Sequence, residues 1–169
     1  PDSCTAEIPL VGSDDWPGWS NRAAELAAAH DLPVDVVERL LWRHGSRIVD
    51  VLAIADDRPE LREILDGGGY VAAEVVHAAR HEGALHLDDI LARRMRVSIE
   101  NEGRGTRVAE AAAELMGAEL GWSPDRVDAE VTTWYQRVEA ERRANAAPDD
   151  PTADAERRRA ADTRGLLDA

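Results

Sequence analysis

The first residues that could do chemistry are a glutamate and two histidines with helical spacing. Glu74, His77 and His81 are three and four residues apart, which places them on one face of a helix. A glutamate-x-x-histidine pair is how helical bundles present ligands to a pair of metal ions. Such a site needs further ligands from other helices, and few histidines remain elsewhere in the chain. We therefore expect no metal site, with both histidines on the polar shoulder of their helix.

A cluster of arginines follows about a dozen residues later. Arg93, Arg94 and Arg96 carry guanidinium groups, which suit a phosphate or an anionic partner. Arginines at the end of a helix also compensate its dipole and form salt bridges with nearby acids. We favour this second, structural role. Glu74 and Glu82 lie on the apolar side of their helix and would be costly to bury unpaired, so an arginine of the cluster is the expected partner of each.

No other residues form a pattern typical of a catalytic or cofactor-binding site. Gly67-Gly68-Gly69 lacks the G-x-G-x-x-G spacing of a dinucleotide-binding turn, and no strand is predicted before it. Cys4 is the only cysteine and has no neighbouring base, so neither a disulfide nor a cysteine-rich metal site is expected. The sequence therefore predicts no catalytic, cofactor-binding or metal-binding residue.

The elements that must position these residues are centred on 71–97. Apolar residues recur every three or four positions on both sides of Gly83, which predicts two helices joined at this glycine. The second helix begins with Asp88 and Asp89 and ends in the arginine cluster, so its charges complement the helix dipole. We expect this helical hairpin to lie at the centre of the core.

The same periodicity predicts helices in most of the remaining chain, and no strand. Gly45 and Gly121 are predicted to end two of these helices, and Ser123 with Pro124 is predicted to begin another. Residues 1–19 are punctuated by proline and glycine and are predicted to be an extended linker, followed by a helical domain over 20–146. Pro148 and Pro151 interrupt the pattern, so 147–169 are predicted to be a disordered charged tail. The predicted fold class is all-α, a compact orthogonal bundle of about six or seven helices.

Composition limits the partners of the chain. The net charge is −14, and all 20 basic residues are arginine. Sequence-independent nucleic-acid binding requires a basic surface, so we expect no nucleic-acid partner, even for a helix-turn-helix drawn through 34–55. The apolar runs are shorter than the ~20 residues that span a bilayer, and no cleavable signal is visible. The chain begins Pro1-Asp2-Ser3 without a methionine, which suggests a piece of a longer protein.

The central segment resembles a known family. It reads Glu82-Gly83-Ala84-Leu85-His86-Leu87-Asp88-Asp89-Ile90-Leu91-Ala92-Arg93-Arg94-Met95-Arg96, with Glu74-Val75 ahead of it. This run is similar to the C-terminal helical domain of FAD-dependent glycerol-3-phosphate dehydrogenases, where a leucine-x-aspartate-x-leucine stretch leads into an arginine-arginine-threonine-arginine motif. Two flanking pieces also fit, Leu120-Gly121-Trp122 with Glu130-Val131, and the linker-like Ile8-Pro9-Leu10-Val11-Gly12. The resemblance covers roughly 4–140 and departs at His86 and Met95, where the family usually has threonine.

The resemblance implies an oxidoreductase of glycerol metabolism. Its intact form would oxidise glycerol 3-phosphate to dihydroxyacetone phosphate by hydride transfer to FAD and pass electrons to a membrane quinone. The flavin and substrate sites would lie in an N-terminal flavin-binding body, and this chain would be its structural, non-catalytic accessory domain. The implied location is cytoplasmic with peripheral membrane association. The resemblance does not decide whether the protein forms a homo-oligomer. The candidate interdomain or structural ion pairs are then Glu74, Glu82, Arg93, Arg94 and Arg96.

A second interpretation belongs to a different class of protein. The chain would be a free-standing acidic helical module whose grooves bind a protein partner. Trp16 and Trp19 bear on both interpretations because they lie in a proline- and glycine-rich stretch, outside any amphipathic stripe. They either anchor an interface with the flavin-binding body or fold back over the first helix, and aromatic residues are favoured as interface anchors.

Overall fold

The computed structural model describes residues 4–66, 68–160 and 163–166. Most of them are helical, which confirms the predicted all-α class. The chain divides into two compact units, Pro1–His77 and Ala78–Ala169, whereas the sequence predicts one helical domain over 20–146. Each unit has its own fully buried apolar side chains.

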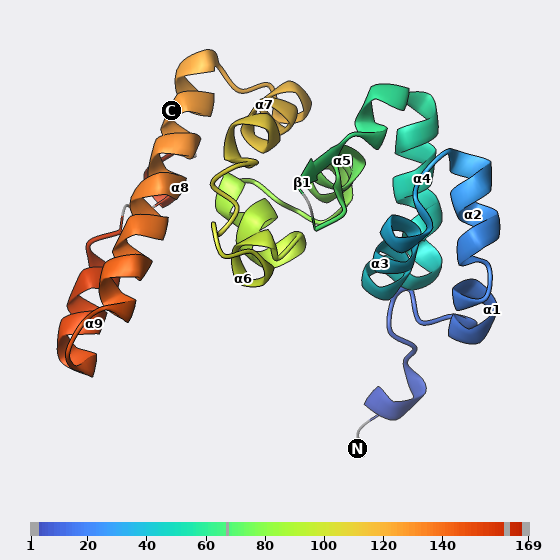
Figure 1. The fold of residues 1–169 in the computed structure, drawn as a ribbon, viewed down its shortest axis with the longest axis horizontal. Helices are drawn as coiled ribbons and strands as arrows, with labels where there is room; N and C mark the ends of the chain where they lie inside the picture. The colour runs from blue at the N-terminus through green and yellow to red at the C-terminus, as the bar shows by residue number, and fades with distance from the viewer. Residues whose placement is uncertain (1–3, 67, 161–162, 167–169) are drawn as a thin grey trace. The chain divides into compact units, whose positions relative to one another are not determined.

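The first unit is built around α3 and α4. Its helices are η1 (Thr5–Glu7), α1 (Trp16–Ser20), α2 (Ala23–His30), α3 (Val34–His44), η2 (Gly45–Arg47), α4 (Ile48–Asp57) and η3 (Pro59–Arg62). Helices α2, α3 and α4 lie side by side (Figure 1), with Val37, Leu40 and Ile48 fully buried among them. Gly45 ends α3, as the sequence predicts. Its φ is +56°, and a Cβ there would lie 1.8 Å from the Gly12 carbonyl oxygen, so glycine is required.

A short antiparallel hairpin follows, which the sequence does not predict. Strand β1 (Ile64–Asp66) pairs with β2 (Tyr70–Val71), and Ile64 lies opposite Val71. Strands of three and two residues are too short for an alternating pattern to stand out. The hairpin leads directly into α5 (Ala72–His81), the predicted helix before Gly83. Residues 71–78 are all buried, so this start of α5 is enclosed on every side rather than along one stripe.

The second unit contains the helices that follow Gly83. They are the π-helix η4 (Asp89–Arg94), α6 (Val97–Glu100), α7 (Ala109–Leu120), α8 (Pro124–Asn145), α9 (Asp150–Arg158) and η5 (Thr163–Leu166). The spacing predicts an α-helix at η4, but the Met95 N–H donates to the carbonyl oxygen of Ile90, five residues earlier, at 2.8 Å. Such π turns are rare and frequent at functional sites. Helix α8 starts as predicted, with the Ser123 hydroxyl accepting from the Arg126 N–H at 3.2 Å and Pro124 in the first turn.

Helix α9 lies where the sequence predicts disorder. It packs beside α8 (Figure 1). Asp149 caps it by accepting from the Thr152 N–H at 2.8 Å, and Pro151 occupies the first turn. Proline in the first turn of a helix removes no hydrogen bond, so it begins α9 rather than breaking the pattern. The prediction is therefore wrong over 150–158.

Helix α1 likewise lies partly inside the predicted linker 1–19. It begins at Trp16 and has Pro17 in its first turn, which again starts a helix. The parts of the linker and tail predictions that fall on 1–3, 161–162 and 167–169 lie outside the described residues, as does Gly67 of the glycine loop. No helix in the described part of the chain is both long and apolar enough to cross a membrane.

Candidate functional site: two buried carboxylate centres and an apolar surface

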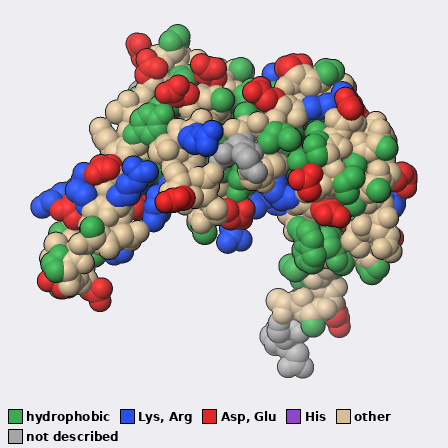
Figure 2. Space-filling model, viewed as in Figure 1, with side chains coloured by type: hydrophobic (Ala, Val, Ile, Leu, Met, Phe, Trp, Pro, Cys, Tyr) green, Lys and Arg blue, Asp and Glu red, His purple; other side chains and the backbone are tan. Residues whose placement is uncertain are grey.

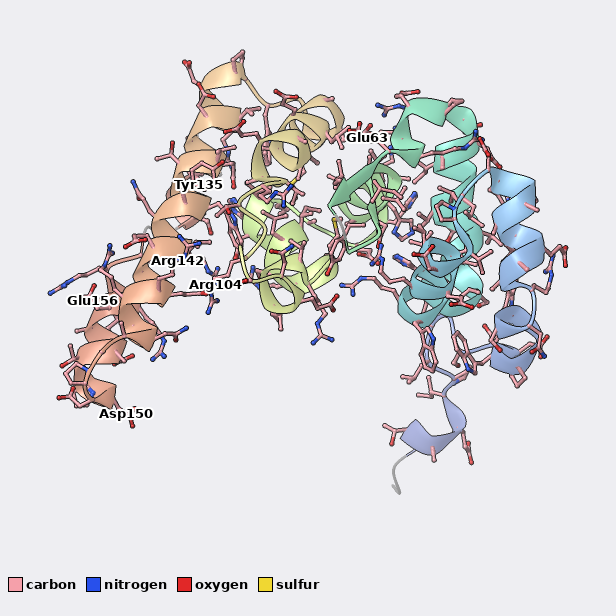
Figure 3. The ribbon with its side chains drawn as sticks, viewed as in Figure 1. Glu63, Arg104, Tyr135, Arg142, Asp150 and Glu156 are labelled. Atoms are coloured by element: carbon pink, nitrogen blue, oxygen red, sulfur yellow. The ribbon has the colours of Figure 1, made fainter. Side chains whose placement is uncertain are left out.

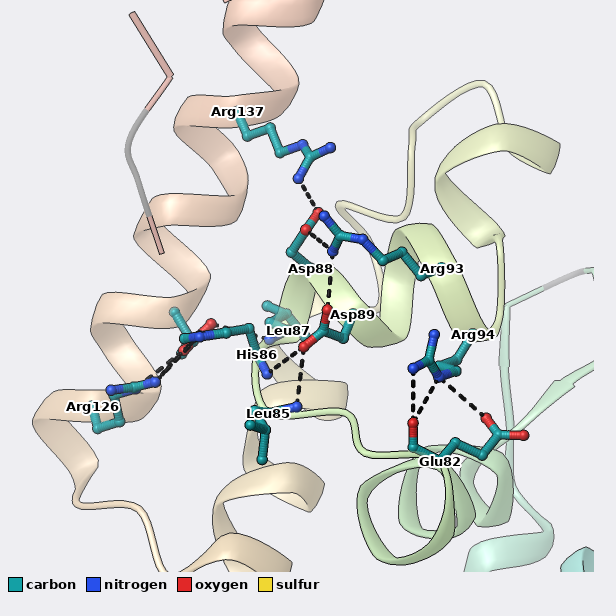
Figure 4. Close-up of polar contacts among 11 residues, drawn as sticks. Glu82, Leu85, His86, Leu87, Asp88, Asp89, Arg93, Arg94, Arg126 and Arg137 are labelled. Carbon is teal, nitrogen blue, oxygen red and sulfur yellow. Dashed lines mark hydrogen bonds and ion pairs between the residues drawn. The ribbon is translucent and has the colours of Figure 1, made fainter. Parts of the chain in front are cut away.

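The most buried carboxylate among the described residues of the second unit is Glu130 on α8, whose side chain is 1% exposed. Its Oε1 accepts from Arg126 Nε at 3.1 Å and Nη2 at 2.7 Å, and lies 2.8 Å from His86 Nδ1. Its Oε2 accepts from the Leu87 N–H at 3.0 Å. Figure 4 shows Arg126 and His86 close together, and both contact this carboxylate. Glu130 therefore joins α8 to the start of the helix that carries the arginine motif.

Asp89 accepts hydrogen bonds from two neighbouring backbone N–H groups at the same helix start. Its Oδ2 accepts from the Leu85 N–H at 3.0 Å and from the His86 N–H at 3.1 Å (Figure 4). The first N–H groups of a helix have no partner within the helix. Two carboxylates, Asp89 and Glu130, supply these partners here, so the acid-first charge pattern seen in the sequence acts through direct hydrogen bonds.

Arg93 pairs with the acids one turn before it. Its Nη1 donates to Asp88 and, at 3.0 Å, to Asp89. The buried Asp88 carboxylate also accepts from Arg137 of α8 (Figure 4). Partial burial opposes the charge of Arg93, but the hydrogen bonds and charges of Asp88 and Asp89 outweigh it, so the pKa of Arg93 is raised above its ordinary value. This arginine is thus occupied by two carboxylates of its own segment, and one of them, Asp88, also accepts from α8.

The other two arginines of the motif differ from each other. Arg94 donates from Nε at 3.0 Å and Nη2 at 2.7 Å to the Glu82 carbonyl oxygen, and its Nε lies 3.8 Å from the Glu82 carboxylate. Glu82 therefore meets an arginine of the cluster. Arg96 is exposed, has a φ of +62° and makes no side-chain ion pair with any residue in the described ranges. A non-glycine residue in this left-handed region is strained by about 1 kcal/mol.

Glu74 in the first unit meets a different arginine from the one expected. The Arg39 Nη2 on α3 donates to Glu74 Oε2, which also accepts from the Val71 N–H at 2.9 Å, while His44 Nε2 lies 3.6 Å from Oε1. Burial raises the pKa of Glu74, but His44, the Arg39 charge and the Val71 N–H outweigh it and hold that pKa below its ordinary value. The expectation of a partner among residues 93–96 is wrong for Glu74, because this face of α5 meets α3 within the first unit.

The two histidines of the spacing pattern also separate. His77 is 4% exposed and its ring lies edge-on to His44, with centroids 5.3 Å apart. His81 is exposed. The predicted place on the polar shoulder therefore holds for His81 and is wrong for His77. Glu74 therefore belongs to a salt-bridge centre with Arg39, and His77 lies beside this centre through its ring contact with His44.

The described part of the glycine loop does not fit a dinucleotide cradle. A phosphate-binding turn connects a strand to a following helix and leaves its N–H groups open to the ligand. Gly68 and Gly69 instead connect two antiparallel strands. The Gly69 carbonyl accepts from Arg39 Nε at 3.0 Å, and a Cβ on Gly68 would lie 2.6 Å from the Tyr70 ring, so neighbouring side chains close this loop.

The first unit also has an exposed apolar surface, which we define by the exposed Ile8, Leu10, Val11 and Trp42 and the half-buried Trp16. Leu10, Val11 and Trp42 are 79%, 90% and 78% exposed. The Trp16 and Trp42 rings are 4.9 Å apart, and together with Leu10 and Val11 they line a cleft of about 350 Å³. Figure 2 shows hydrophobic side chains gathered where the N-terminal segment reaches α3. The spacing of apolar residues does not predict this surface. Helix α3 already has an apolar inner face, and Trp42 lies on its outer face.

The fold and these centres define a helical domain whose buried charges hold its own helices together. A family model described as the C-terminal domain of alpha-glycerophosphate oxidase matches residues 3–127. The chain belongs to this family, which confirms the resemblance seen in its motifs.

Three relatives illustrate the match. The chain is 44% identical over 166 residues, 98% of its length, to "Glycerol-3-phosphate dehydrogenase 2" of Mycobacterium tuberculosis (strain ATCC 25618 / H37Rv). It is 43% identical over 163 residues to "Glycerol-3-phosphate dehydrogenase" of Mycobacterium leprae (strain TN), and covers 28% of each of these two relatives. It is 27% identical over 127 residues, 75% of its length, to "Probable glycerol-3-phosphate dehydrogenase, mitochondrial" of Dictyostelium discoideum, of which it covers 20%. No solved structure matches the chain.

Proposed function

We propose that this chain is the accessory C-terminal domain of an FAD-dependent glycerol-3-phosphate dehydrogenase. The intact enzyme oxidises glycerol 3-phosphate to dihydroxyacetone phosphate, the flavin accepts the hydride, and a quinone receives the electrons at the membrane. The observation that carries the proposal is the 44% identity over 98% of this chain to a glycerol-3-phosphate dehydrogenase of which it covers 28%. FAD and substrate would bind to the rest of such an enzyme, which would be cytoplasmic and peripherally attached to the membrane.

Within this proposal the domain is structural rather than catalytic. A catalytic acid or base has to reach substrate with its proton-transferring atom. The carboxylates of Glu74, Asp88 and Glu130 instead accept from arginines and helix-start N–H groups inside their own units. Arg93 and Arg94 are occupied in the same way. These contacts of the arginine motif therefore support a structural role, in which the motif holds the helices of its own unit together.

The apolar surface supports docking to a flavin-binding body. Large exposed apolar patches mark interaction sites, and aromatic side chains are favoured as their anchors. Trp42 is 78% exposed beside Trp16, a costly arrangement in water for a domain that had no partner. Arg96 is a second candidate contact, since it is exposed and held in a strained backbone conformation.

Substitution of the apolar surface in the full-length enzyme tests the proposal. Trp42→Ser should lower flavin retention and glycerol 3-phosphate oxidation by about tenfold, the scale of a lost interface anchor. The matched control is Ile99→Ser in the second unit, which removes a 66% exposed side chain outside this surface and should change neither quantity. The same Trp42→Ser change in the isolated chain should leave its melting temperature within a few degrees, which separates docking from folding.

The second candidate is the stand-alone acidic module, which the same apolar surface also favours. It would bind a separate protein through Trp16 and Trp42 rather than a covalently attached body. Full flavin content and full activity in the Trp42→Ser enzyme would contradict domain docking at this surface. A full-length protein that lacks stoichiometric flavin altogether would contradict the dehydrogenase assignment itself.

A further inference from the structure

A basic cleft lies in the second unit, on the side of α8 that faces α9. It has a volume of about 560 Å³, within the range of small-molecule sites. Its polar lining consists of Arg104, Arg137, Glu141, Asn145, Arg157 and Arg158. Figure 2 shows arginine side chains gathered over this part of α8 and α9. Arg137 also donates to the buried Asp88, but no residue of this lining contacts Glu74 or Glu130 in the described part of the chain.

The charge of the cleft is opposite to that of the chain. Four arginines and one glutamate line it, a formal charge of +3, in a protein whose net charge is −14. Glu141 is shared, because it accepts from both Arg104 and Arg137. Arg158 pairs with the exposed Asp154 at 2.5 Å. Arg157 is exposed and forms no ion pair with any described residue, so its charge has no acidic partner within the described ranges.

The inner arginines are held in place before any ligand arrives. Arg104 reaches from the loop before α7 toward α8 (Figure 3), where Glu141 fixes it, and Arg137 lies between Glu141 and Asp88. A guanidinium has five N–H donors, and the contacts of Arg104 with described residues use its Nη1 alone. The remaining donors are available to a second oxyanion, with less side-chain entropy to lose because the salt bridges already restrict the rotamers.

We propose that this cleft binds an anionic ligand through a phosphate group. Guanidinium forks match phosphate oxygens in paired hydrogen bonds, and the Asn145 amide adds a neutral donor. A volume of about 560 Å³ leaves room for more than one phosphate or for an organic phosphate. A free phosphate compound and the phosphate of a lipid headgroup share this chemistry.

The cleft is separate from what the family model describes. That match ends at residue 127, so every lining residue except Arg104 lies beyond it. The mycobacterial relatives, in contrast, match the chain over 96% to 98% of its length. Almost all of the cleft therefore lies outside the residues that the family model matches.

Titration of the 169-residue chain with inorganic pyrophosphate tests the proposal at low salt, where surface charges are least screened. Calorimetry should show saturable binding, and Arg157→Gln combined with Arg158→Gln should weaken it about tenfold, as expected for lost charge-assisted hydrogen bonds. Arg159→Gln is the matched control, since Arg159 follows α9 directly and does not line the cleft. It should bind like the parent. The single variant Arg157→Gln, at an exposed position, should still weaken binding if the double variant folds poorly.

Vesicles distinguish the two sources of phosphate. Binding to phosphatidylglycerol vesicles that pyrophosphate displaces, without binding to phosphatidylcholine vesicles, would assign a lipid headgroup. Binding of pyrophosphate alone would assign a free phosphate compound. No saturable binding of either probe by the parent, or equal losses in Arg159→Gln and Arg157→Gln, would overturn the proposal.

Discussion

Glu74 and Glu130 lie in different units but are held by the same kinds of group. They are 2% and 1% exposed, the most deeply buried acids in the described part of the chain. Each accepts from one arginine and from one N–H at the start of a helix, and each faces a histidine. A buried carboxylate needs this degree of compensation, because an unpaired charge in the interior is strongly unfavourable.

The two centres differ in which partner is local. Glu74 takes its N–H from Val71, one turn away, as in a capping box, and its arginine from 35 residues earlier. Glu130 takes its arginine from Arg126, one turn away, and its N–H from Leu87, 43 residues earlier. The same acceptor thus links helices through a side chain in the first unit and through backbone in the second. Substitution of Glu74 should therefore weaken the link between α3 and α5, whereas substitution of Glu130 should weaken the link between α8 and the segment that begins at Leu87.

The largest effect should follow from Glu130→Ala. It strands the guanidinium of Arg126, whose side chain is 5% exposed, and leaves the Leu87 N–H buried without a partner. We expect a loss of about 3–5 kcal/mol in the free energy of unfolding, measured with urea. Glu139→Ala is the control on the same helix, since its side chain is 53% exposed. A loss below about 1 kcal/mol for Glu130→Ala, the scale of an exposed pair, would show that Glu130 is not the link between α8 and the motif helix.

Glu74→Gln should have a smaller effect that depends on pH. Arg39 is 19% exposed and keeps its hydrogen bond to the Gly69 carbonyl and its place over the Tyr70 ring, so we expect a loss of about 2 kcal/mol at pH 7. The pKa of Glu74 is held below its ordinary value of 4.5, so its carboxylate stabilises the fold above that pH. This contribution disappears as the pH falls through the lower folded-state pKa.

Urea unfolding across the acid range checks this prediction. The free energies of unfolding of the parent and of Glu74→Gln should converge as the pH falls below 4.5, because the parent carboxyl becomes protonated. Arg39→Met provides the complementary variant, and the double variant should cost less than the two single changes added together. A constant difference between parent and Glu74→Gln from pH 7 into the acid range would mean that the charge of Glu74 adds nothing.

Asp89→Ala should cost less than either buried glutamate. Asp89 caps the same helix start as Glu130, but its side chain is 22% exposed, so water can replace part of what it supplies to Leu85 and His86. The expected loss is about 1 kcal/mol, the usual cost of a helix cap. Asp128→Ala on α8 removes an exposed acid and serves as the control. A loss of unfolding free energy equal to that of Glu130→Ala would show that capping, rather than burial, determines the size of both losses.

The parts of the fold that the sequence predicts are those set by neighbouring residues. Gly45 ends α3, Gly121 ends α7 and Ser123 caps α8, all as predicted. Each of these signals depends on the backbone freedom of glycine or on a side chain within one turn of the helix end. The family motif gives information beyond single helix ends, because residues 74–96 indicate the type of domain.

The parts that sequence could not supply depend on distant contacts. The spacing identifies Glu74 as needing a partner but gives no way to choose Arg39 over the arginines of the motif, since α3 and α5 meet only in the fold. The π-helix has the apolar spacing of an α-helix, and nothing in its composition indicates a wider turn. Helix α9 is not predicted for a different reason, because its low apolar content conceals a capped helix that packs on α8.

The smallest effect should follow from Asp149→Ala, which removes an exposed carboxylate cap. Asp149 accepts from the Thr152 N–H as Glu130 accepts from Leu87, but it is exposed. The Thr152 hydrogen bonds hold the pKa of Asp149 below its ordinary value of 3.8, so the cap persists above that pH and weakens below it. The variant should lose amide-exchange protection within α9 and leave the protection of α7 unchanged, because α9 adds little apolar contact beyond Ala153. Hydrogen exchange with fragment resolution separates the two helices. Equal loss of protection in both would place α9 inside the cooperative core, and burial would then no longer explain the order of effects from Glu130 to Asp149.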